Sequence, residues 1–375
     1  MLALAAGLGC APHRDVPPGM NDVPEYLGGA SRAVTAAESV SARPAELWRA
    51  TPGRGTLGAP ALGERVVAVA SVDRWLYALD PRSGRAYWRH HASSPYATGP
   101  VIAGDAVYAA EEGEGAPVTA LALRDGKRRW RTRVGDVTAP ILVAEGRVFG
   151  ATRDGAAFAL RAADGRPLWR REVGGRPGAG SLSGPVLVGG RLVLVTVADS
   201  LVVLDARSGR IDGKAALPAG VAAPLARLDD STVAVASPAG LLLAVALPGG
   251  RVRWRVPTGA PVAGAPIVAH DTVYALTSEC TLWTVPARAP ERAGATAVAP
   301  PAGGERARCA TVAGPALVRG GVLVATVSGD VVYFDRVAGR AVWTRQAGGE
   351  LRHPPSILNG QVVVAPVIGP VVSFR

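Results

Sequence analysis

Residues 59–89 read APALGERVVAVASVDRWLYALDPRSGRAYWR, and this stretch predicts one four-stranded antiparallel sheet. Short apolar runs at 60–62, 65–70 and 75–79, and a final run at 85–89, are separated by turn residues. The segment DPRSG at 80–84 predicts a tight turn, because Asp caps a turn through its side chain, Pro presets φ and Gly accepts a positive φ. The almost wholly apolar middle strands indicate a sheet that is buried on both faces.

The same pattern recurs along the chain, and each copy opens on a proline. Eight such prolines follow one another at steps of 39 to 49 residues: Pro60, Pro100, Pro140, Pro185, Pro224, Pro266, Pro315 and Pro355. A period of about 40 to 50 residues built from short strands is typical of a β-propeller, in which each repeat forms one blade. The sequence therefore predicts an all-β, eight-bladed propeller with four-stranded antiparallel blades.

A Gly-x-x-x-Trp unit marks the predicted outer strand of most repeats. We expect the tryptophans to wedge between neighbouring blades, each with an indole N–H that needs an acceptor. A ligand-binding role for these rings is the alternative, but a regularly repeated ring favours a repeated packing contact. The predicted blade-docking residues are Trp48, Trp88, Trp130, Trp169, Trp254 and Trp343. The fourth repeat carries Gly213 in place of the Trp, and the sixth departs from the pattern after Trp283.

The two ends of the repeat region complement each other. The last repeat, 355–375, supplies three strands and stops before its Trp strand, while residues 45–49 (AELWR) form an isolated Trp strand ahead of the first proline. Together they complete one blade, which removes a free sheet edge and closes the ring. The propeller domain is therefore predicted to span 45–375.

Residues 1–10, MLALAAGLGC, resemble the end of a bacterial lipoprotein signal with Cys10 as the lipidated residue. Leu8 and Gly9 precede the Cys, although Gly7 stands where the signal usually has Leu and no basic segment comes first. The alternative is an unprocessed N-terminus with a chance Cys. Residues 11–44 are rich in Pro, Gly, Ala and Ser without periodicity, which predicts a flexible tether. This predicts a protein that is anchored to a membrane rather than spanning it.

The remaining cysteines, Cys280 and Cys309, flank the one irregular stretch, 286–308. In an oxidising periplasm they could form a disulfide that staples this stretch to the propeller, and two buried thiols are the alternative. Neither belongs to a CxxC pair, so no metal site is predicted here.

The chain has a formal net charge of +11, carried mostly by arginine. Alternation along the outer strands directs part of these side chains to the rim, where a basic surface attracts anionic lipids or acidic polymers. Compositional bias is the alternative, and with no nucleic-acid motif we predict no nucleic-acid partner. The arginines concerned are Arg128, Arg129, Arg131, Arg133, Arg170, Arg171, Arg251, Arg253 and Arg255.

The repeats resemble the PQQ-like propeller repeat family over about 330 of the 375 residues. The resemblance is carried by LDPRSGRAYW at 79–88, by FD at 334–335 with Gly339 and Trp343, and by LDARSG at 204–209. Within this family, the length, blade count and N-terminus are most similar to the BamB-type lipoproteins of the outer-membrane protein assembly machinery. This resemblance implies a non-enzymatic, monomeric scaffold in the periplasm, anchored to the outer membrane, with assembly or other envelope proteins as partners and no cofactor.

Two other functions stay open. One is a propeller that binds an envelope polymer or another ligand. The other is a quinoprotein dehydrogenase, which would need a quinone, Ca²⁺ and an Asp base, and which usually has a longer chain and an adjacent Cys-Cys pair. Candidate polar residues are scattered, and we interpret them as turn or surface groups: His90, His91, His270, His353, Glu111, Glu112, Glu114, Asp229 and Asp230. No catalytic residue is therefore predicted.

Overall fold

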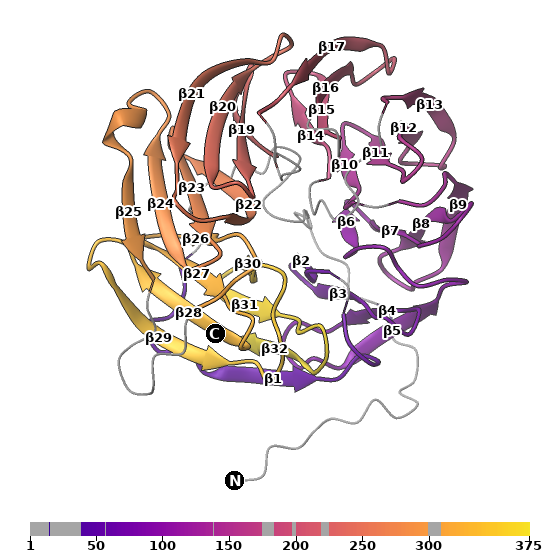
Figure 1. Cartoon of the computed structure of the whole chain (residues 1–375). Coiled ribbons are helices and arrows are strands. Elements are labelled where there is room, and N and C mark those ends of the chain that lie inside the picture. The colour runs from indigo at the N-terminus through magenta and orange to yellow at the C-terminus, as the bar shows by residue number, and fades with distance from the viewer. Residues whose placement is uncertain are drawn as a thin grey trace.

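In the computed structural model the chain forms a ring of antiparallel sheets (Figure 1). The structure describes residues 15, 39–56, 58–137, 139–174, 184–196, 200–218, 225–298 and 309–375. Within these residues the strands make eight four-stranded sheets, which confirms the predicted eight-bladed propeller. Cys10 and most of the predicted tether lie outside the described residues.

The first four blades follow one another along the chain, and each runs from an inner to an outer strand. Blade 1 holds β2 (Ala61–Gly63), β3 (Val66–Ala70), β4 (Trp75–Leu79) and β5 (Ala86–His91). Blade 2 holds β6 (Val101–Ala103), β7 (Ala106–Ala110), β8 (Pro117–Ala122) and β9 (Arg128–Arg133). Blade 3 holds β10 (Leu142–Ala144), β11 (Arg147–Ala151), β12 (Ala156–Arg161) and β13 (Pro167–Glu172). Blade 4 holds β14 (Val186–Val188), β15 (Arg191–Val195), β16 (Ser200–Asp205) and β17 (Ile211–Ala216).

The next three blades repeat the order, and the last is completed from the N-terminal side. Blade 5 holds β18 (Leu225–Asp229), β19 (Thr232–Ser237), β20 (Leu241–Ala246) and β21 (Arg251–Pro257). Blade 6 holds β22 (Val262–Ala269), β23 (Thr272–Thr277), β24 (Thr281–Pro286) and β25 (Gly294–Ala297). Blade 7 holds β26 (Ala316–Val318), β27 (Gly321–Ala325), β28 (Asp330–Asp335) and β29 (Arg340–Gln346). Blade 8 holds β30 (Ser356–Leu358), β31 (Gln361–Val364), β32 (Val371–Phe374) and β1 (Glu46–Ala50).

The closure of the ring is as predicted. β1 pairs antiparallel with β32, and Ala45 and Arg375 exchange backbone hydrogen bonds of 2.8 and 2.9 Å just beyond this pair. The first and last strands of the domain therefore share one sheet, which ties the two ends of the ring together (Figure 1).

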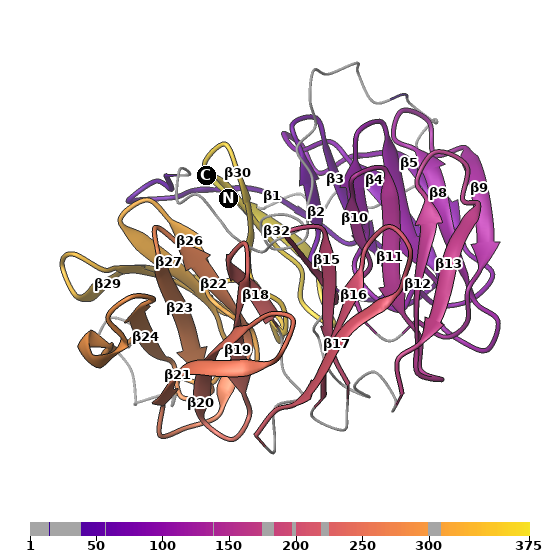
Figure 2. The same ribbon diagram turned by 90° about the horizontal axis from the view of Figure 1, so that it is seen from above.

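The hydrophobic core lies between blades. The described residues form eight apolar clusters, and each joins two neighbouring blades, from blades 1 and 2 around to blades 8 and 1. In Figure 2 the strands of blades 1 to 3 stand side by side, in keeping with sheets that pack face to face. This packing explains why the middle strands are apolar on both faces, as in VVAVA at 66–70, which is buried throughout.

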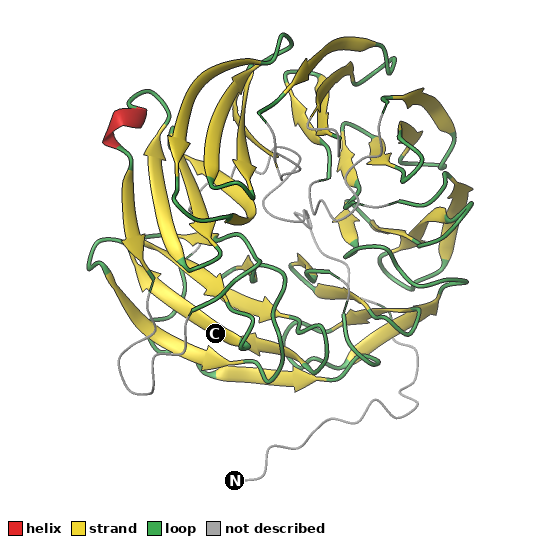
Figure 3. Ribbon diagram, in the orientation of Figure 1, coloured by secondary structure: helices red, strands yellow, loops and turns green. Residues whose placement is uncertain are grey.

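Blade 6 differs from the sequence expectation. The stretch 286–308 was predicted to be irregular, but its described part forms a 3-10 helix, η1 (Pro290–Arg292), and then the outer strand β25 (Figure 3). The strand reads GATA, so neither the Trp nor an alternation of apolar residues signalled it. The strand forms nevertheless because β24 offers an unpaired edge, so tertiary context decides the conformation.

Candidate functional site: inter-blade sockets, outer rim and linker residues

The repeated tryptophans lie between blades and dock on the next blade around the ring. Trp48, on β1 of blade 8, donates its indole N–H to the carbonyl of Pro81, in the β4–β5 turn of blade 1, at 2.7 Å. The same ring lies against Gly84 of that turn, where a Cβ atom in place of the glycine hydrogen would be 2.7 Å from Trp48 Cε3. The glycine is therefore required by the close approach of the preceding blade's indole.

This socket repeats around the ring. In each case the indole N–H donates to a backbone carbonyl of the next blade. This carbonyl belongs to the turn between the third and fourth strands, except in blade 8, where Ser41 provides it. The pairs are Trp88 with Leu123 at 2.8 Å, Trp130 with Ala162 at 2.8 Å, Trp169 with Ala206 at 3.1 Å, Trp254 with Ala287 at 3.0 Å and Trp343 with Ser41 at 3.0 Å. The indole rings of Trp88, Trp130 and Trp169 lie against Gly126, Gly165 and Gly209.

The Gly-x-x-x-Trp unit thus combines two halves of different sockets. Its Gly receives the Trp of the preceding blade, and its Trp enters the next blade. Where the preceding blade has no Trp on its outer strand, the glycine has no indole ring beside it. A Cβ atom on Gly250 would meet Ala215 of blade 4, and one on Gly339, which follows blade 6, would meet no atom within 4 Å. The packing role of the Trp residues was predicted from the sequence, but this role of the glycines was missed, although the fixed spacing was its signal.

Ser41 and Pro44, at the end of the predicted tether, contact blade 7. Ser41 accepts the Trp343 indole N–H, and the Pro44 carbonyl accepts hydrogen bonds of 3.1 and 3.0 Å from the Arg345 guanidinium. Blade 8 takes its fourth strand, β1, from the N-terminal side, so no turn joins its third and fourth strands. The Ser41 carbonyl therefore accepts the Trp343 indole N–H, as a turn carbonyl accepts the indole N–H in other blades.

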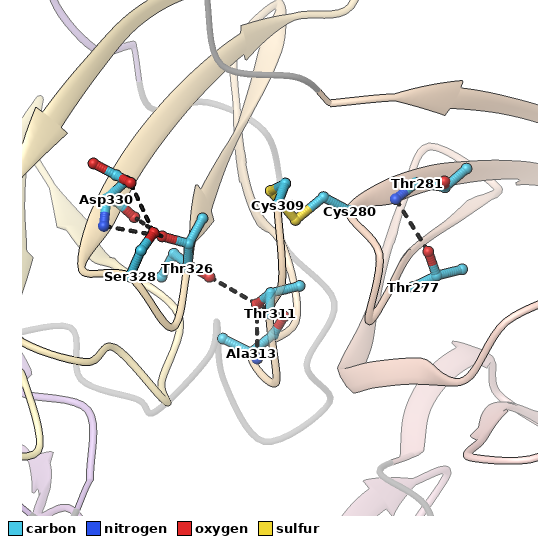
Figure 4. Close-up of a disulfide and its surroundings, with 10 residues drawn as sticks. Thr277, Cys280, Thr281, Cys309, Thr311, Ala313, Thr326, Ser328 and Asp330 are labelled. Carbon is cyan, nitrogen blue, oxygen red and sulfur yellow. Dashed lines mark hydrogen bonds between the residues drawn. A yellow bond between two sulfur atoms is a disulfide. The ribbon is translucent and has the colours of Figure 1, made fainter. Parts of the chain in front are cut away.

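Cys280 and Cys309 form a disulfide in the structure, with an S–S distance of 2.06 Å and a Cα–Cα distance of 5.7 Å (Figure 4). It joins the β23–β24 turn of blade 6 to the segment that enters blade 7. Hydroxyl groups order the chain beside it: Thr277 Oγ1 accepts the Thr281 amide at 3.0 Å, and Thr311 Oγ1 donates to the Ala325 carbonyl at 2.7 Å. The bridge therefore holds the linker between these two blades.

The arginines of the outer strands divide into paired and unpaired groups. Arg129, Arg170 and Arg253 form ion pairs with Asp105, Asp154 and Asp229. Arg131 pairs with Glu111, and Arg171 donates to the Gly209 carbonyl. The remaining four of the nine form no ion pair within the described part of the chain: Arg128, Arg133, Arg251 and Arg255. The rim around β9 and β21 is accordingly basic and accessible.

Glu111 corrects the expectation of a solvated acidic loop. Its side chain is 3% exposed, and it accepts hydrogen bonds from the amides and hydroxyls of Ser93 and Ser94 at 2.6 to 3.1 Å. Arg131 Nε lies 3.6 Å from Glu111 Oε1. Burial acts to raise the pKa of Glu111, but the serine hydrogen bonds and the Arg131 charge outweigh it and hold the pKa below its usual value. Glu112 and Glu114 are exposed as predicted.

The other polar candidates occupy structural positions. Burial, followed by the charge of Arg128, lowers the pKa of His90, while His91 packs edge-on against Trp75 with ring centroids 4.6 Å apart. Asp229 accepts the Ser231 amide at 2.7 Å in the β18–β19 turn. Among the described residues, no group of three His, Cys, Asp or Glu side chains is placed to hold a metal ion.

An open polar cleft of about 690 Å³ lies where blades 8 and 1 meet. Its lining includes Glu64, Asp80, Arg82 and Tyr87 of blade 1 and Asn359 of the β30–β31 turn. Burial and then the neighbouring Asp80 charge raise the pKa of Tyr87. The cleft offers anionic, cationic and neutral hydrogen-bonding groups, and the Tyr87 phenol is hydrogen-bonded to the Asp80 carboxylate.

The comparisons with known proteins agree with this architecture. The family model described as outer membrane protein assembly factor BamB matches residues 36–139, 114–212, 212–293 and 281–373. The chain belongs to the BamB family. Outer membrane protein assembly factor BamB of Bordetella pertussis (strain Tohama I) is 30% identical over 354 residues, which cover 88% of this chain and 86% of that protein.

Solved structures share the BamB-like fold. The crystal structure of BamB from Moraxella catarrhalis superposes with a TM-score of 0.68 at 16% identity, covering 90% of this chain and 100% of that one. A europium-containing methanol dehydrogenase superposes with a TM-score of 0.69 at 11% identity, covering 92% and 96%. At these identities both show the fold alone. Within the described ranges, no helix has the length and apolarity needed to cross a membrane.

Proposed function

We propose that this protein is a lipid-anchored periplasmic scaffold that assists the assembly of outer-membrane β-barrel proteins through protein–protein contacts and catalyses no reaction. One observation carries the proposal: the BamB family model matches the chain from residue 36 to residue 373, nearly the whole propeller. The relative that matches over 88% of the chain is likewise named as an outer membrane protein assembly factor.

The distribution of polar groups supports binding rather than catalysis. Carboxylates whose pKa is lowered accept hydrogen bonds within turns and linkers, as Glu111, Asp205 and Asp335 do, or also pair with arginines of the outer strands, as Asp105 and Asp154 do. The repeated aromatic rings dock one blade on the next. The surfaces left for a partner are the outer strands, the loops of the two faces and the polar cleft between blades 8 and 1. Such surfaces suit a scaffold that presents strands and loops to other proteins.

The anchor and the compartment are separate parts of the proposal. Lipidated Cys10 would hold the propeller near the membrane through a tether, and the Cys280–Cys309 disulfide suits the oxidising periplasm. Mass analysis of the mature protein tests the anchor. We expect acyl chains on a protein that begins at Cys10, and release of Cys10→Ala from membranes. An unmodified N-terminus in a membrane-bound protein would contradict the anchor.

The experiment that tests the proposal is chemical cross-linking in the native envelope, followed by capture of this protein and mass spectrometry. We expect the outer-membrane assembly barrel and its companion proteins among the captured partners. Capture of none of them, while the protein stays membrane-bound, would contradict the scaffold function and favour binding of an envelope polymer. The same capture from cells that lack the protein is the control for background.

A further inference from the structure

Blades 4 and 6 have outer strands without a tryptophan, and the two interfaces that follow them differ. Between blades 4 and 5 the chain closes up: a Cβ atom on Gly213 would be 2.4 Å from the Pro248 carbonyl oxygen, and one on Gly250 would be 2.0 Å from Ala215 Cβ. Between blades 6 and 7, a Cβ atom on Gly339 would meet no atom of the described residues within 4 Å, and Gly339 is exposed. The outer part of the interface between blades 6 and 7 is therefore open.

The register of blade 6 shows which residue stands in the place of the missing tryptophan. In blade 2, Trp130 pairs with Ala120, three positions before the indole acceptor Leu123. In blade 6, the pair three positions before the indole acceptor is Thr284 and Gly294. A Cβ atom on Gly294 would likewise meet no atom of the described residues within 4 Å. Blade 6 therefore supplies no side chain at the place where six other blades supply an indole ring.

Contacts nearer the axis of the ring still join blades 6 and 7. An apolar cluster that includes Leu276 and Val322 lies between them. Tyr274, on β23, is 6% exposed and accepts a hydrogen bond of 2.7 Å from Arg336 Nη1. The Arg336 guanidinium carbon lies 4.8 Å from the centroid of the same ring. Because the Tyr274 ring is buried between the two blades, its accessibility reports on their separation.

The disulfide lies at this same interface (Figure 4). Cys280 belongs to the β23–β24 turn of blade 6, and Cys309 belongs to the segment that enters blade 7. The Cys280 carbonyl accepts the amide of Val298, the residue after β25, at 2.8 Å, and the Thr311 amide donates to the Ser278 carbonyl at 3.0 Å. The bridge therefore connects the entrance of blade 7 to the turn of blade 6 that holds the end of β25.

We propose that the Cys280–Cys309 disulfide is a redox switch for the ring. In the oxidised form it holds blades 6 and 7 together where no indole does so, and its reduction by a dithiol loosens this interface before any other. A cross-link restricts the local opening of the segments that it joins, and this restriction ends when the bond is reduced. The inference uses contacts within the chain and does not rest on the proposed function.

The exchange begins at the more accessible sulfur. Cys280 is buried and Cys309 is half-buried, so a thiolate of the reductant attacks the Cys309 sulfur, forms a mixed disulfide with it and releases the Cys280 thiolate. The second thiol of the reductant then attacks the reductant's own sulfur in the mixed disulfide and releases the Cys309 thiolate. The two cysteines together gain two electrons and two protons, and the dithiol leaves as a disulfide.

The first test compares the natural protein with the double variant Cys280→Ser, Cys309→Ser. Tyrosines are nitrated with tetranitromethane and located by peptide mass analysis. Tyr108 is the matched control, because it is 5% exposed and faces the interface that contains Trp130. In the double variant we expect about tenfold faster nitration of Tyr274 and no change at Tyr108. Equal nitration of Tyr274 in both proteins, or equal acceleration of both tyrosines, would overturn the proposal.

A tryptophan introduced into blade 6 tests whether the disulfide replaces an indole. Gly294→Trp, added to the double variant, directs its ring at the turn of blade 7 and should return the nitration of Tyr274 to the natural rate. Ala295→Trp is the control and should leave nitration fast, because Ala295 pairs with Trp283, which packs between blades 5 and 6. Nitration of Tyr274 that is equally fast with either tryptophan would overturn the proposal.

Reduction of the natural protein is tested by hydrogen exchange with and without dithiothreitol, and the free thiols are counted by mass after alkylation. The Val327 amide donates to Ala310 in the linker that enters blade 7, and the Arg153 amide donates to Asp136 at the same place of blade 3. We expect about tenfold faster exchange at Val327 and no change at Arg153. Unchanged exchange at Val327 in the reduced protein, or a disulfide that dithiothreitol does not reduce in the folded protein, would overturn the proposal.

Discussion

The indole of Trp88 lies directly against Gly126 of the next blade, so that a Cβ atom on this glycine would be 2.5 Å from Trp88 Cε3. The same Trp donates its N–H to Leu123, in the turn that contains Gly126. Blade-to-blade stability therefore depends on residues from two repeats, and the motif residues Gly126 and Trp130 serve different interfaces.

We predict that Gly126→Ala is more destabilising than Gly339→Ala. The two glycines have nearly equal φ angles of +68° and +66°, but a Cβ atom on Gly339 would have no other atom within 4 Å. Both variants should lose about 1 kcal/mol from the left-handed backbone. Gly126→Ala should lose about 1–3 kcal/mol more because the Trp88 ring must move. Denaturant unfolding measures the difference, and equal losses would contradict the socket.

Trp88→Phe should reduce the free energy of unfolding by about 1–3 kcal/mol, because the buried Leu123 carbonyl loses its hydrogen bond and the smaller ring leaves space. Thermal unfolding is the measurement. Trp75→Phe is the matched control, since Trp75 is half-buried, packs on His91 and on the edge of the cluster between blades 8 and 1, and does not dock on a turn glycine of the next blade. An equal loss in both variants would mean that the socket hydrogen bond contributes little.

Glu111 should make stability depend on pH in the acid range. Its pKa in the folded protein lies below the ordinary value of 4.5. The stability that the Glu111 charge contributes is therefore fully present above pH 4.5 and is lost as the pH falls through the folded-state pKa. We expect Glu111→Gln to be less stable at pH 7 by about 1–3 kcal/mol. The difference between the two proteins should shrink toward pH 3. A difference that stays constant across this pH range would show that the Glu111 charge is not responsible.

The Cys280–Cys309 disulfide closes a loop with a sequence separation of 29 residues. Cys280→Ser combined with Cys309→Ser should therefore cost about 2–4 kcal/mol, mostly through greater freedom of the unfolded chain. Melting temperatures of the natural protein and the double variant, without reductant, measure the loss. Mass analysis of an unreduced digest gives the pairing directly, and free thiols at both positions would contradict it.

The repeated features of the fold were predictable from the sequence, because they recur. Proline-led strands, the Asp80–Gly84 turn and the isolated Trp48 strand were sufficient to predict eight blades and their closure. β25 was missed because its four small residues carry no strand signal and depend on the free edge of β24. The burial of Glu111 was missed because its partners, Ser93 and Ser94, come from the linker between blades 1 and 2.

The measurement that tests the central claim most directly is the rate at which newly made β-barrel proteins become folded in the outer membrane of cells that lack this chain. The appearance of their heat-modifiable, protease-resistant form after a pulse of labelling gives this rate. We predict slower assembly, restored by the natural protein. Restoration by Cys10→Ala should be weaker. An unchanged rate in cells that lack the chain would contradict an assembly function.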